Sequence, residues 1–438
     1  MLLIEKEINI PFETKGLPLL EYFRHNVRKQ ISSNDIPIRF AITKSDSNIY
    51  TCELGILRNI DNSPIPQCDS IFKYSPRAVD NTNAFNALLL IPTGIGADIG
   101  GHAGDGGSVA RLIAAACDTL ITHPNVVNAS DINELPENGL YVEGSILTKL
   151  IMGTIGLHKV RSNRVAVIVN KHDDRNIYMD TINTVNAARA TWGMDCPFVK
   201  ELESQLSMKA LYSSSGRAVG EVKGLYELYQ FLKDKRSEYD AVAISSVIDV
   251  PDKYCDDYFV SHGEIVNPWG GVEAMLTHAI SILLNIPTAH APMIQNNEAA
   301  NKHYGIVDPR MAAEAVSVTY LHCVLKGLHR SPHIIQNPAS NMSSDILSAK
   351  DISCVIIPDG CIGLPTLSAI EQKIPVIAVR ENSNRMKNDL DQLPFSHNKL
   401  FIVDNYLEAV GVIASLKAGV TTSSVRRPLG QMQIITNS

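Results

Sequence analysis

The chain of 438 residues lacks the features that mark several large classes of protein. It has no stretch of the ~18 consecutive apolar residues that a membrane-spanning helix needs. No two of its eight cysteines stand in C-x-x-C spacing, which argues against a zinc knuckle or a thioredoxin-type site. Positive charge is scarce as well, since 39 Lys and Arg against 46 Asp and Glu leave a net charge of −7. Nucleic acid binding requires a basic surface, so we expect no nucleic-acid partner.

Two further absences bear on location and chemistry. The first ten residues carry Glu5 and Lys6 where a secretory signal would have its apolar core, so we expect a cytoplasmic protein without a membrane partner. No G-x-S-x-G sequence is present, which excludes the nucleophile turn of the α/β-hydrolases.

The composition and the spacing of apolar runs predict an α/β fold. Hydrophobic residues make up 45% of the chain, enough for large buried cores. From about residue 84 short apolar runs alternate with helical patterns, as expected for parallel sheets. Strands are predicted at 87–91, 119–122, 140–143, 165–169, 241–247, 354–357, 375–379 and 400–403, and helices at 17–29, 108–117, 179–191, 222–233, 274–284, 309–325, 366–372 and 406–416.

We predict three regions from this pattern. Residues 1–83 form a small α+β region, residues 84–236 a first Rossmann-like lobe and residues 237–438 a second one, each lobe with a mostly parallel sheet. The boundary between the lobes is placed by the charged cluster at Lys233–Ser237. Small ligands bind in clefts between such lobes, so we expect a small-molecule ligand there. The chain can also form a homo-oligomer.

A loop rich in glycine follows the predicted strand at 87–91. Glycine lets main-chain N–H groups approach a ligand, and the start of a helix attracts an anion. No Lys or Arg occurs from residue 92 to 110, so this is not a P-loop, and the spacing misses the dinucleotide fingerprint by one residue. The loop predicts a ligand-binding segment or, alternatively, a flexible surface loop; the ligand-binding candidates are Gly94, Gly96, Gly100, Gly101, Gly104, Asp105, Gly106 and Gly107.

Polar residues also follow the next two predicted strands. His123 comes directly after the strand at 119–122, and Asn125 and Asn128 follow it. The carboxyl ends of parallel strands meet at one edge of a sheet, so a neutral His123 can act as a general acid or base there, with the Asn side chains orienting a ligand. Glu143, after the strand at 140–143, can orient the imidazole. The alternative is a structural His123 in the turn before Pro124.

The second half of the chain adds one carboxylate and two histidines. Glu273 and His278 are five positions apart on a predicted helix, about 140° around its axis, so they are not a metal pair. Glu273 either faces the cleft or caps its helix. His290 lies between Pro287 and Pro292, where a rigid backbone makes it either a buried structural residue or a functional one. The sequence assigns no metal site and no cofactor.

Two other segments have polar residues in loops. The segment from Ser213 to Arg217 either binds an anion, with Arg217 as the cation, or forms a solvated turn. Cys361 precedes a predicted helix, where a thiol can become nucleophilic, but no histidine is placed beside it by the sequence.

Five groups of segments together resemble a known family, the domain-of-unknown-function 3326 family of bacteria. They are Gly94–Ser108, Leu120–Asn128 with Leu140–Gly144, Glu273–His278 with Ile286–Pro292, Asp308–Glu314, and Pro375–Asn382. The resemblance covers nearly all of the chain from residue 84 onward and carries no known reaction. It implies that seven positions matter: Asp105, His123, Asn125, Glu143, Glu273, His278 and His290. His102 and Cys361 depart from the family pattern.

These observations predict a metabolic enzyme that binds a small anionic or polyhydroxyl metabolite in a cleft. The predicted catalytic residues are His123, Glu143, Glu273, His278 and His290. The reaction class stays open between lyase, isomerase and transferase. One alternative is a transferase that uses a nucleotide or a sugar nucleotide, with two glycosyltransferase-like lobes. The other is a non-catalytic metabolite-binding or assembly protein.

Overall fold

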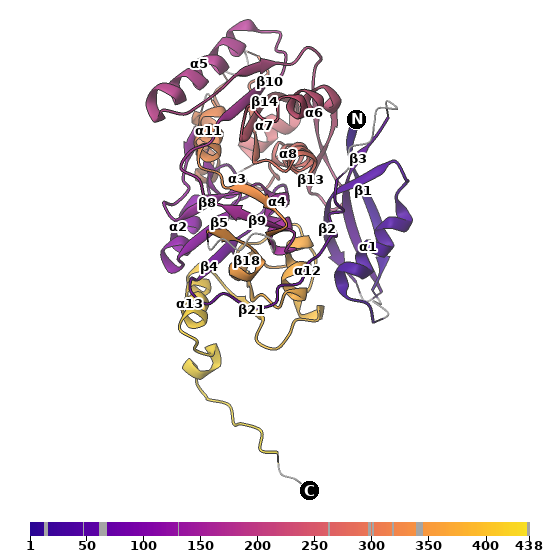
Figure 1. Cartoon of the computed structure of the whole chain (residues 1–438), viewed down its shortest axis with the longest axis vertical. Helices are drawn as coiled ribbons and strands as arrows, with labels where there is room; N and C mark the ends of the chain where they lie inside the picture. The colour runs from indigo at the N-terminus through magenta and orange to yellow at the C-terminus, as the bar shows by residue number, and fades with distance from the viewer. Residues whose placement is uncertain are drawn as a thin grey trace.

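The computed structural model describes the whole chain except residues 13–15, 47, 61–67, 130, 262, 297–298, 300–301, 318, 339–344 and 436–438. It confirms a mixed α/β protein, with most strands gathered in two large sheets (Figure 1). In the part of the chain that it describes, no helix combines the length and the apolar character needed to cross a lipid bilayer.

The six-stranded sheet is parallel throughout, with the order β21-β20-β18-β4-β5-β8. Its strands are short apolar runs that are almost entirely buried, as expected for a parallel sheet covered by helices. The helices α2 (Gly107–Ala116) and α13 (Tyr406–Lys417) pack together against it. The strands are β4 (Asn86–Leu89), β5 (Thr119–Thr122), β8 (Gly139–Tyr141), β18 (Ile352–Pro358), β20 (Val376–Val379) and β21 (Leu400–Val403).

The ten-stranded sheet is mixed, with the order β11-β10-β14-β12-β13-β1-β3-β2-β19 and with β15 beside β14. The strands around β14 are parallel, whereas the N-terminal strands pair antiparallel. The prediction of two Rossmann-like lobes is therefore not confirmed, because the part of this sheet from β12 through β13, β1, β3 and β2 to β19 pairs antiparallel. Its strands are β1 (Leu2–Pro11), β2 (Asp35–Ser45), β3 (Ile49–Arg58), β10 (Val165–Val169), β11 (Val199–Glu201), β12 (Ser207–Tyr212), β13 (Ala218–Lys223), β14 (Ala241–Asp249), β15 (Thr288–Met293) and β19 (Ile362–Gly363).

The strand pairing crosses both of the predicted domain boundaries. In the parallel sheet β4 pairs with β18, which lies more than two hundred residues later in the chain. In the mixed sheet β1 pairs with β13, so residues 1–83 are not a separate sheet. The three regions 1–83, 84–236 and 237–438 stay a prediction. Their boundaries do not coincide with the boundaries of the sheets.

The remaining elements connect and cover the two sheets. Two small sheets complete them, one of three strands and one of two. The helices are α1 (Leu19–Gln30), α3 (Pro124–Val127), α4 (Gly144–Ile151), α5 (Arg175–Trp192), α6 (Leu225–Asp234), α7 (Asp252–Val260), α8 (Gly270–Leu284), α10 (Ala312–Val316), α11 (Leu321–His329) and α12 (Leu364–Glu371), with 3-10 turns at 309–311, 349–351, 390–392 and 422–425; the small-sheet strands are β6 (Asn128–Ala129), β7 (Ile132–Asn133), β9 (Ile155–His158), β16 (His333–Gln336) and β17 (Ile346–Leu347).

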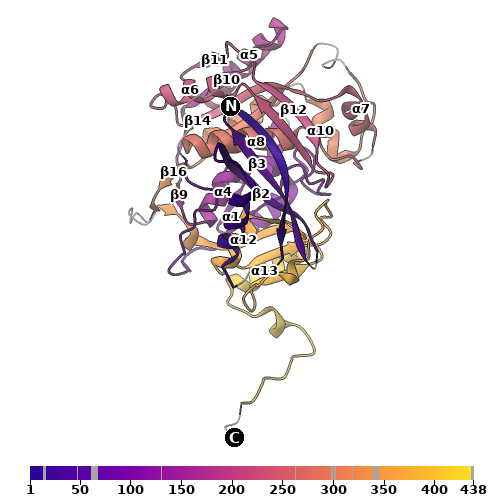
Figure 2. The ribbon, with the colours of Figure 1, turned by 90° about the vertical axis from the view of Figure 1, so that its right-hand side faces the viewer.

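Helix α8 lies in the middle of the molecule (Figures 1 and 2). It packs against β2, β12, β13 and β15 of the mixed sheet and against α4, which follows the parallel sheet. Its sequence is apolar on nearly all sides, as a fully surrounded helix requires. The close approach to β13 depends on Gly271, because a Cβ at that position would collide with the carbonyl oxygen of Ala218. This packing fixes the position of every side chain that α8 carries.

Two predicted segments differ from the structure for a physical reason. The polar loop predicted at 213–220 is the tight turn of a hairpin, in which β12 and β13 pair from Ser207 to Lys223. The helix predicted at 309–325 is broken into a 3-10 turn, α10 and α11. At 309–325 tertiary contacts outweigh the local helical pattern.

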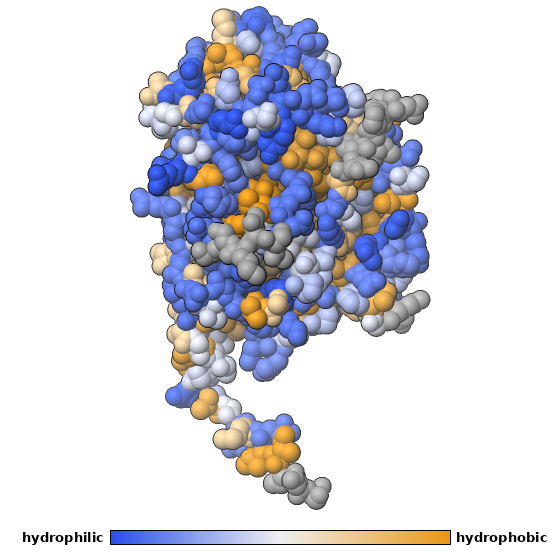
Figure 3. Space-filling view, viewed as in Figure 1, coloured by the Kyte–Doolittle hydropathy of each residue, from blue (hydrophilic) through white to orange (hydrophobic). Residues whose placement is uncertain are grey.

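The C-terminal segment extends away from the rest of the molecule (Figure 1). Its exposed apolar side chains include Met432, Ile434 and Ile435. Figure 3 shows apolar side chains on this extension. The face of the main body in that view is mostly hydrophilic, with smaller apolar areas between the polar side chains (Figure 3).

Candidate functional site

A cavity of about 850 Å³, here called the outer cavity, contains all five predicted catalytic side chains in its lining. Its lining joins the carboxyl ends of β5 and β8 to residues of β14 and β15 in the other sheet. Ligands in α/β proteins bind at such strand ends. The structure therefore brings together His123, Glu143, Glu273, His278 and His290 from four separate segments of the chain, although their catalytic role stays a prediction.

Glu143 and His278 form the first carboxylate–imidazole pair. Glu143 precedes α4, and its Oε2 accepts hydrogen bonds from the main-chain N–H groups of Ser145, at 2.9 Å, and Ile146, at 3.3 Å. Its Oε1 lies 2.5 Å from Nδ1 of His278. Burial by itself raises the pKa of Glu143, but the facing His278 and the bonds from Ser145 outweigh it and lower the pKa. Glu143 is therefore an ionised carboxylate that caps a helix and orients the ring of His278.

The other nitrogen of His278 is the one available to a ligand. Among the described residues Nε2 of His278 has no hydrogen-bond partner, and the side chain is 18% exposed. A ring that carries its proton on Nδ1, the nitrogen that faces Glu143, leaves the lone pair of Nε2 for a ligand. This is the arrangement of a general base oriented by a carboxylate.

His123 is a neutral imidazole of fixed tautomer. Its ring is buried, and Nε2 accepts a hydrogen bond of 3.2 Å from the N–H of Ile91. Burial lowers the pKa of His123 to about 4, so the ring is uncharged at pH 7. Because Nε2 is an acceptor, the proton resides on Nδ1, where it can be donated. The side chain does not cap the turn before Pro124, since α3 has no side-chain cap.

Glu273 and His290 form the second pair, on the side of the mixed sheet. Nδ1 of His290 lies 2.9 Å from Oε1 of Glu273, and Nε2 lies 2.8 Å from Oγ of Ser246. Both ring nitrogens of His290 thus have protein partners. His290 can therefore affect a ligand only by positioning Glu273. We therefore assign His290 as a positioning residue. Glu273, which is a quarter exposed, does not cap α8.

The two residues predicted on α8 point to different sheets. Glu273 reaches β15 of the mixed sheet, and His278 reaches the end of β8 in the parallel sheet. This follows from their separation of five residues, about 140° around the helix axis. The central helix therefore connects two histidine–carboxylate pairs across one cavity.

The glycine-rich loop binds carboxylates, but those carboxylates belong to the protein. Oδ1 of Asp105 accepts hydrogen bonds from the N–H groups of Gly100, at 2.8 Å, and His102, at 3.3 Å. Oε1 of Glu314 accepts another from Ala103 at 2.8 Å. These N–H groups are therefore not open to an external anion as we predicted for the loop.

The glycines themselves are explained by conformation and close packing. Four have positive φ, a region that other residues rarely adopt. A Cβ at Gly104 would collide with Ala129, and a Cβ at Gly100 would lie 2.7 Å from a methyl group of Ile91. The glycines with positive φ are Gly94, Gly96, Gly100 and Gly104. Of the predicted glycines, Gly94 and Gly101 line the outer cavity, and Gly96 lines a separate cleft. The others, Gly100, Gly104, Gly106 and Gly107, pack against neighbouring residues of the protein.

Asn125 and Asn128 line the outer cavity, but their amide groups hold the protein together. Nδ2 of Asn125 donates to the carbonyl oxygens of Ile91, at 3.1 Å, and Gly100, at 2.7 Å. Nδ2 of Asn128 donates to the hydroxyl of Tyr141 at 2.9 Å. The bonds of Asn125 attach the glycine-rich loop to the start of α3, and the bond of Asn128 attaches β6 to β8. Both residues therefore have a structural role.

A buried polar cluster beside the loop was missed by sequence reasoning. Tyr258 of α7 lies 2.7 Å from Nδ1 of His102, and Asn267 donates to Glu314 at 2.9 Å. One carboxylate oxygen of Asp105 and one of Glu314 are buried without a hydrogen bond to any described residue. Asp105 was already a candidate from the sequence, and Glu314 is the last residue of a segment that resembles the family. Ser246 had none, because a lone serine in an apolar strand looks like a packing residue.

Burial in this cluster raises the pKa of Asp105 and of Glu314 to about 7 in each case. In the unfolded chain such carboxyl groups release their protons near pH 4. Between these values the folded state binds more protons than the unfolded state, so these groups favour folding less as the pH rises from about 4 to 7.

We expect Asp105→Asn to reduce this loss of stability. The Asn side chain keeps an acceptor for Gly100 and His102 but does not ionise. Urea unfolding at pH 5.5 and pH 8 should show a smaller fall in midpoint for Asp105→Asn than for the wild type. Asp98→Asn, an exposed carboxyl of the same loop, is the matched control and should behave as wild type. Equal falls for Asp105→Asn and wild type would show that Asp105 does not carry the effect.

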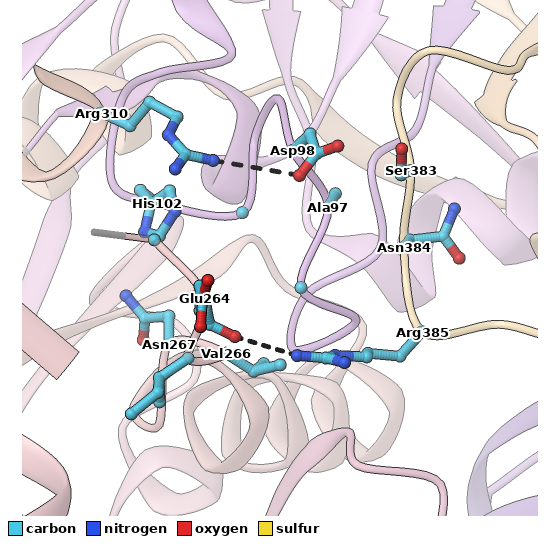
Figure 4. A pocket seen from close by; sticks show the side chains of 14 residues that line it. Ala97, Asp98, His102, Glu264, Val266, Asn267, Arg310, Ser383, Asn384 and Arg385 are labelled. Carbon is cyan, nitrogen blue, oxygen red and sulfur yellow. Dashed lines mark hydrogen bonds and ion pairs between the residues drawn. The ribbon is translucent and has the colours of Figure 1, made fainter. Parts of the chain in front are cut away.

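A second, more open cleft of about 520 Å³ lies on the other side of the loop (Figure 4). Arg310 and Arg385 point into it from opposite sides, and Asp98 and Glu264 lie beside them (Figure 4). Arg310 is bound by Asp308 at 3.0 Å, and Arg385 donates to the main-chain oxygen of Glu264 at 2.9 Å. Both guanidinium groups are thus neutralised or hydrogen-bonded within the protein.

The described residues contain no group of three or more His, Cys, Asp or Glu side chains arranged to hold a metal ion. Cys361 is buried, and burial raises the pKa of its thiol far above the normal value, so it is not an activated nucleophile. Arg217, predicted in a loop, is almost fully buried and paired with Glu53.

Comparison with known proteins places the chain in a family. Residues 86–426 match the family described as "Protein of unknown function (DUF3326)", and the chain belongs to this family, as the resemblance implied. It is 30% identical over 351 residues to a protein of Synechococcus sp. (strain ATCC 27144 / PCC 6301 / SAUG 1402/1) named as an uncharacterized lipoprotein, covering 78% of this chain and 93% of that one. No solved structure matches the chain.

Proposed function

We propose that this protein is an enzyme that transfers protons on a small polyhydroxyl carbonyl compound in the outer cavity. One observation carries the proposal. His278 is oriented by Glu143 through Nδ1 and keeps Nε2 for a ligand, while the neutral His123 lines the same cavity. A base and a neutral hydrogen-bond donor beside each other suit proton removal next to a carbonyl group.

The reaction begins at His278. Its Nε2 removes a proton from the carbon beside the carbonyl group, and the electron pair moves to the carbonyl oxygen. Nδ1–H of His123 donates a hydrogen bond to that oxygen as its negative charge develops. The ionised Glu143 stabilises the imidazolium form of His278. Return of the proton to the same carbon or to the neighbouring one gives an isomerase, and loss of a leaving group from the next carbon gives a lyase.

The polar groups of the outer cavity favour hydroxyl groups over a bare phosphate. Glu143, Glu273 and Glu314 all line it, and carboxylates accept hydrogen bonds from hydroxyl groups but repel anions. Three N–H groups of the glycine-rich loop, those of Gly100, His102 and Ala103, are already bonded to Asp105 and Glu314. A ligand with several hydroxyl groups therefore fits this cavity better than a nucleotide.

The proposal is tested by hydrogen exchange. The protein is incubated in D₂O with a panel of hydroxy acids, keto acids, aldoses and ketoses, and the loss of each C–H signal is followed by proton NMR. We expect at least one compound to exchange the hydrogen beside its carbonyl group faster than without protein. Tight binding of a panel member without any exchange would instead support the non-catalytic alternative.

We also propose that the protein works in the cytoplasm. All eight cysteines are free in the structure, which suits a reducing compartment. The relative from Synechococcus is named a lipoprotein, which points instead to attachment at a membrane. A homo-oligomer stays a prediction.

A further inference from the structure

A smaller cavity of about 150 Å³, here called the inner cavity, lies on the other side of His123 and His278. Both histidines line both cavities, so they form part of the wall between them. The inner cavity is lined mainly by apolar side chains, among them Ile38, Phe40, Leu90, Ile282, Ile357 and Leu364. The lining also contains the two histidines, several hydroxyl side chains and three basic side chains, Arg39, Lys149 and Arg217.

Arg39 is the unusual member of this lining. Its Nη1 is buried, and among the described residues Arg39 makes no hydrogen bond and no ion pair. A buried donor without a partner costs about 1–3 kcal/mol, and more when it is charged. Such groups therefore persist where a ligand supplies the missing acceptor.

The register of the sheet places Arg39 and Glu5 on either side of one glycine. Arg39 on β2 and Glu5 on β1 both lie opposite Gly55 of β3, which has no side chain between them. The oxygens of Glu5 are buried without hydrogen bonds, and burial raises the pKa of Glu5. Among the described residues no ion pair joins Glu5 to Arg39, and Oε1 of Glu5 lies 3.9 Å from Nη1 of Arg217 instead.

The other charged groups facing Arg39 are already engaged. Glu53 is bonded to Arg217 and accepts a hydrogen bond of 2.6 Å from Ser215. Nζ of Lys149, also in the lining, donates to Oδ1 of Asn285 at 2.9 Å. Among the described residues neither Arg39 nor Lys149 has a carboxylate partner within ion-pair distance, and both line the apolar cavity beside the two proposed catalytic histidines.

We infer that the inner cavity binds the carboxylate end of a short-chain organic acid, with Arg39 as its cation. An arginine and a carboxylate form strong charge-assisted hydrogen bonds, and a buried carboxylate needs such a partner. The apolar lining surrounds the alkyl part of the acid. Apolar cavities of about 150 Å³ hold a molecule of the size of benzene, which corresponds to an acid such as butyrate.

This inference rests on the proposed function and names its substrate class. With the carboxylate at Arg39, the chain of the acid runs past His123 and His278, and its hydroxylated end lies in the outer cavity. The substrate of the proton transfer is then a small hydroxy or keto acid. The anion that we predicted for the glycine-rich loop lies instead at a cationic side chain from the N-terminal region.

Binding of butyrate to the full-length protein tests the inference by isothermal titration calorimetry, with butyramide as the uncharged counterpart. We expect butyrate to bind and butyramide not to bind. Arg39→Gln should weaken butyrate binding at least tenfold. Arg385→Gln, which changes an exposed arginine of the second cleft, is the matched control and should change it less than twofold.

A second variant covers the case in which Arg39→Gln fails to fold. Leu364→Phe fills the inner cavity and leaves Arg39 unchanged. It should also abolish butyrate binding. No binding of butyrate to the wild type, or undiminished binding to a folded Arg39→Gln or Leu364→Phe protein, would overturn the inference.

The two proposals fail in different ways. If butyrate binds through Arg39 but no panel compound exchanges its hydrogen, the proposed function fails and the carboxylate site remains. If exchange occurs and Arg39→Gln leaves butyrate binding unchanged, the carboxylate site alone fails. His278→Gln should keep butyrate binding within about threefold of wild type, because the carboxylate is held by Arg39.

Discussion

His278→Gln is expected to lower the rate of enzyme-dependent hydrogen exchange by about 10²–10⁴-fold, the usual contribution of a general base. Glutamine has a similar size and keeps a hydrogen-bonding group beside Glu143, but it cannot accept a proton at neutral pH. The measurement is the exchange rate in D₂O of the panel compound that responds to the wild type. The loss should appear in the rate at saturating compound rather than in the concentration needed for saturation.

The control for this variant is another histidine on the surface. His397 is exposed, and His397→Gln should exchange hydrogen at the wild-type rate. Circular dichroism should show that His278→Gln is folded, because the side chain is partly exposed to the cavity. A folded His278→Gln protein that exchanges at the wild-type rate would remove His278 from the mechanism.

Arg217→Met is expected to cause the largest loss of stability. Arg217 and Glu53 each have side chains that are 1% exposed, and they are bonded to each other. Removing the guanidinium leaves a carboxylate buried without its counter-charge, which costs about 3–5 kcal/mol. Urea unfolding of the variant should show a decrease of this size in the free energy of unfolding.

A double variant separates lost charge pairing from lost packing. Glu53→Leu combined with Arg217→Met removes both charges, and it should recover most of the stability that Arg217→Met loses. Arg385→Met changes an exposed arginine and should alter the free energy of unfolding by less than about 0.5 kcal/mol. Similar losses for the single and double variants would show that packing of Arg217, and not its charge, stabilises this region.

The strands of the parallel sheet were readable from local pattern, but their partners were not. Apolar runs such as Val376–Val379 matched the observed strands because buried parallel strands are short and apolar along their whole length. The pairing of β4 with β18 depends on contacts between segments far apart in the chain. For the same reason the predicted lobes, drawn as continuous stretches, do not correspond to the two sheets.

The glycine-rich loop shows the limit of motif reasoning. Its composition fits both an anion site and a tightly packed loop, since glycine permits close approach in either case. Only the structure shows that Asp105 and Glu314 are the acceptors of its N–H groups. Glu314 lies about two hundred residues away, so no spacing within the loop could reveal it.

The sequence alone determined the class of fold, the order of most of its strands and helices, and the set of histidines and carboxylates that follow strand ends. Those properties depend on local apolar periodicity and on the rule that parallel strands end at a common edge. The tertiary structure decided that α8 connects two histidine–carboxylate pairs and that Arg39 is left without a partner. These facts depend on the angular position of side chains around a buried helix and on cross-strand register, which distant contacts establish.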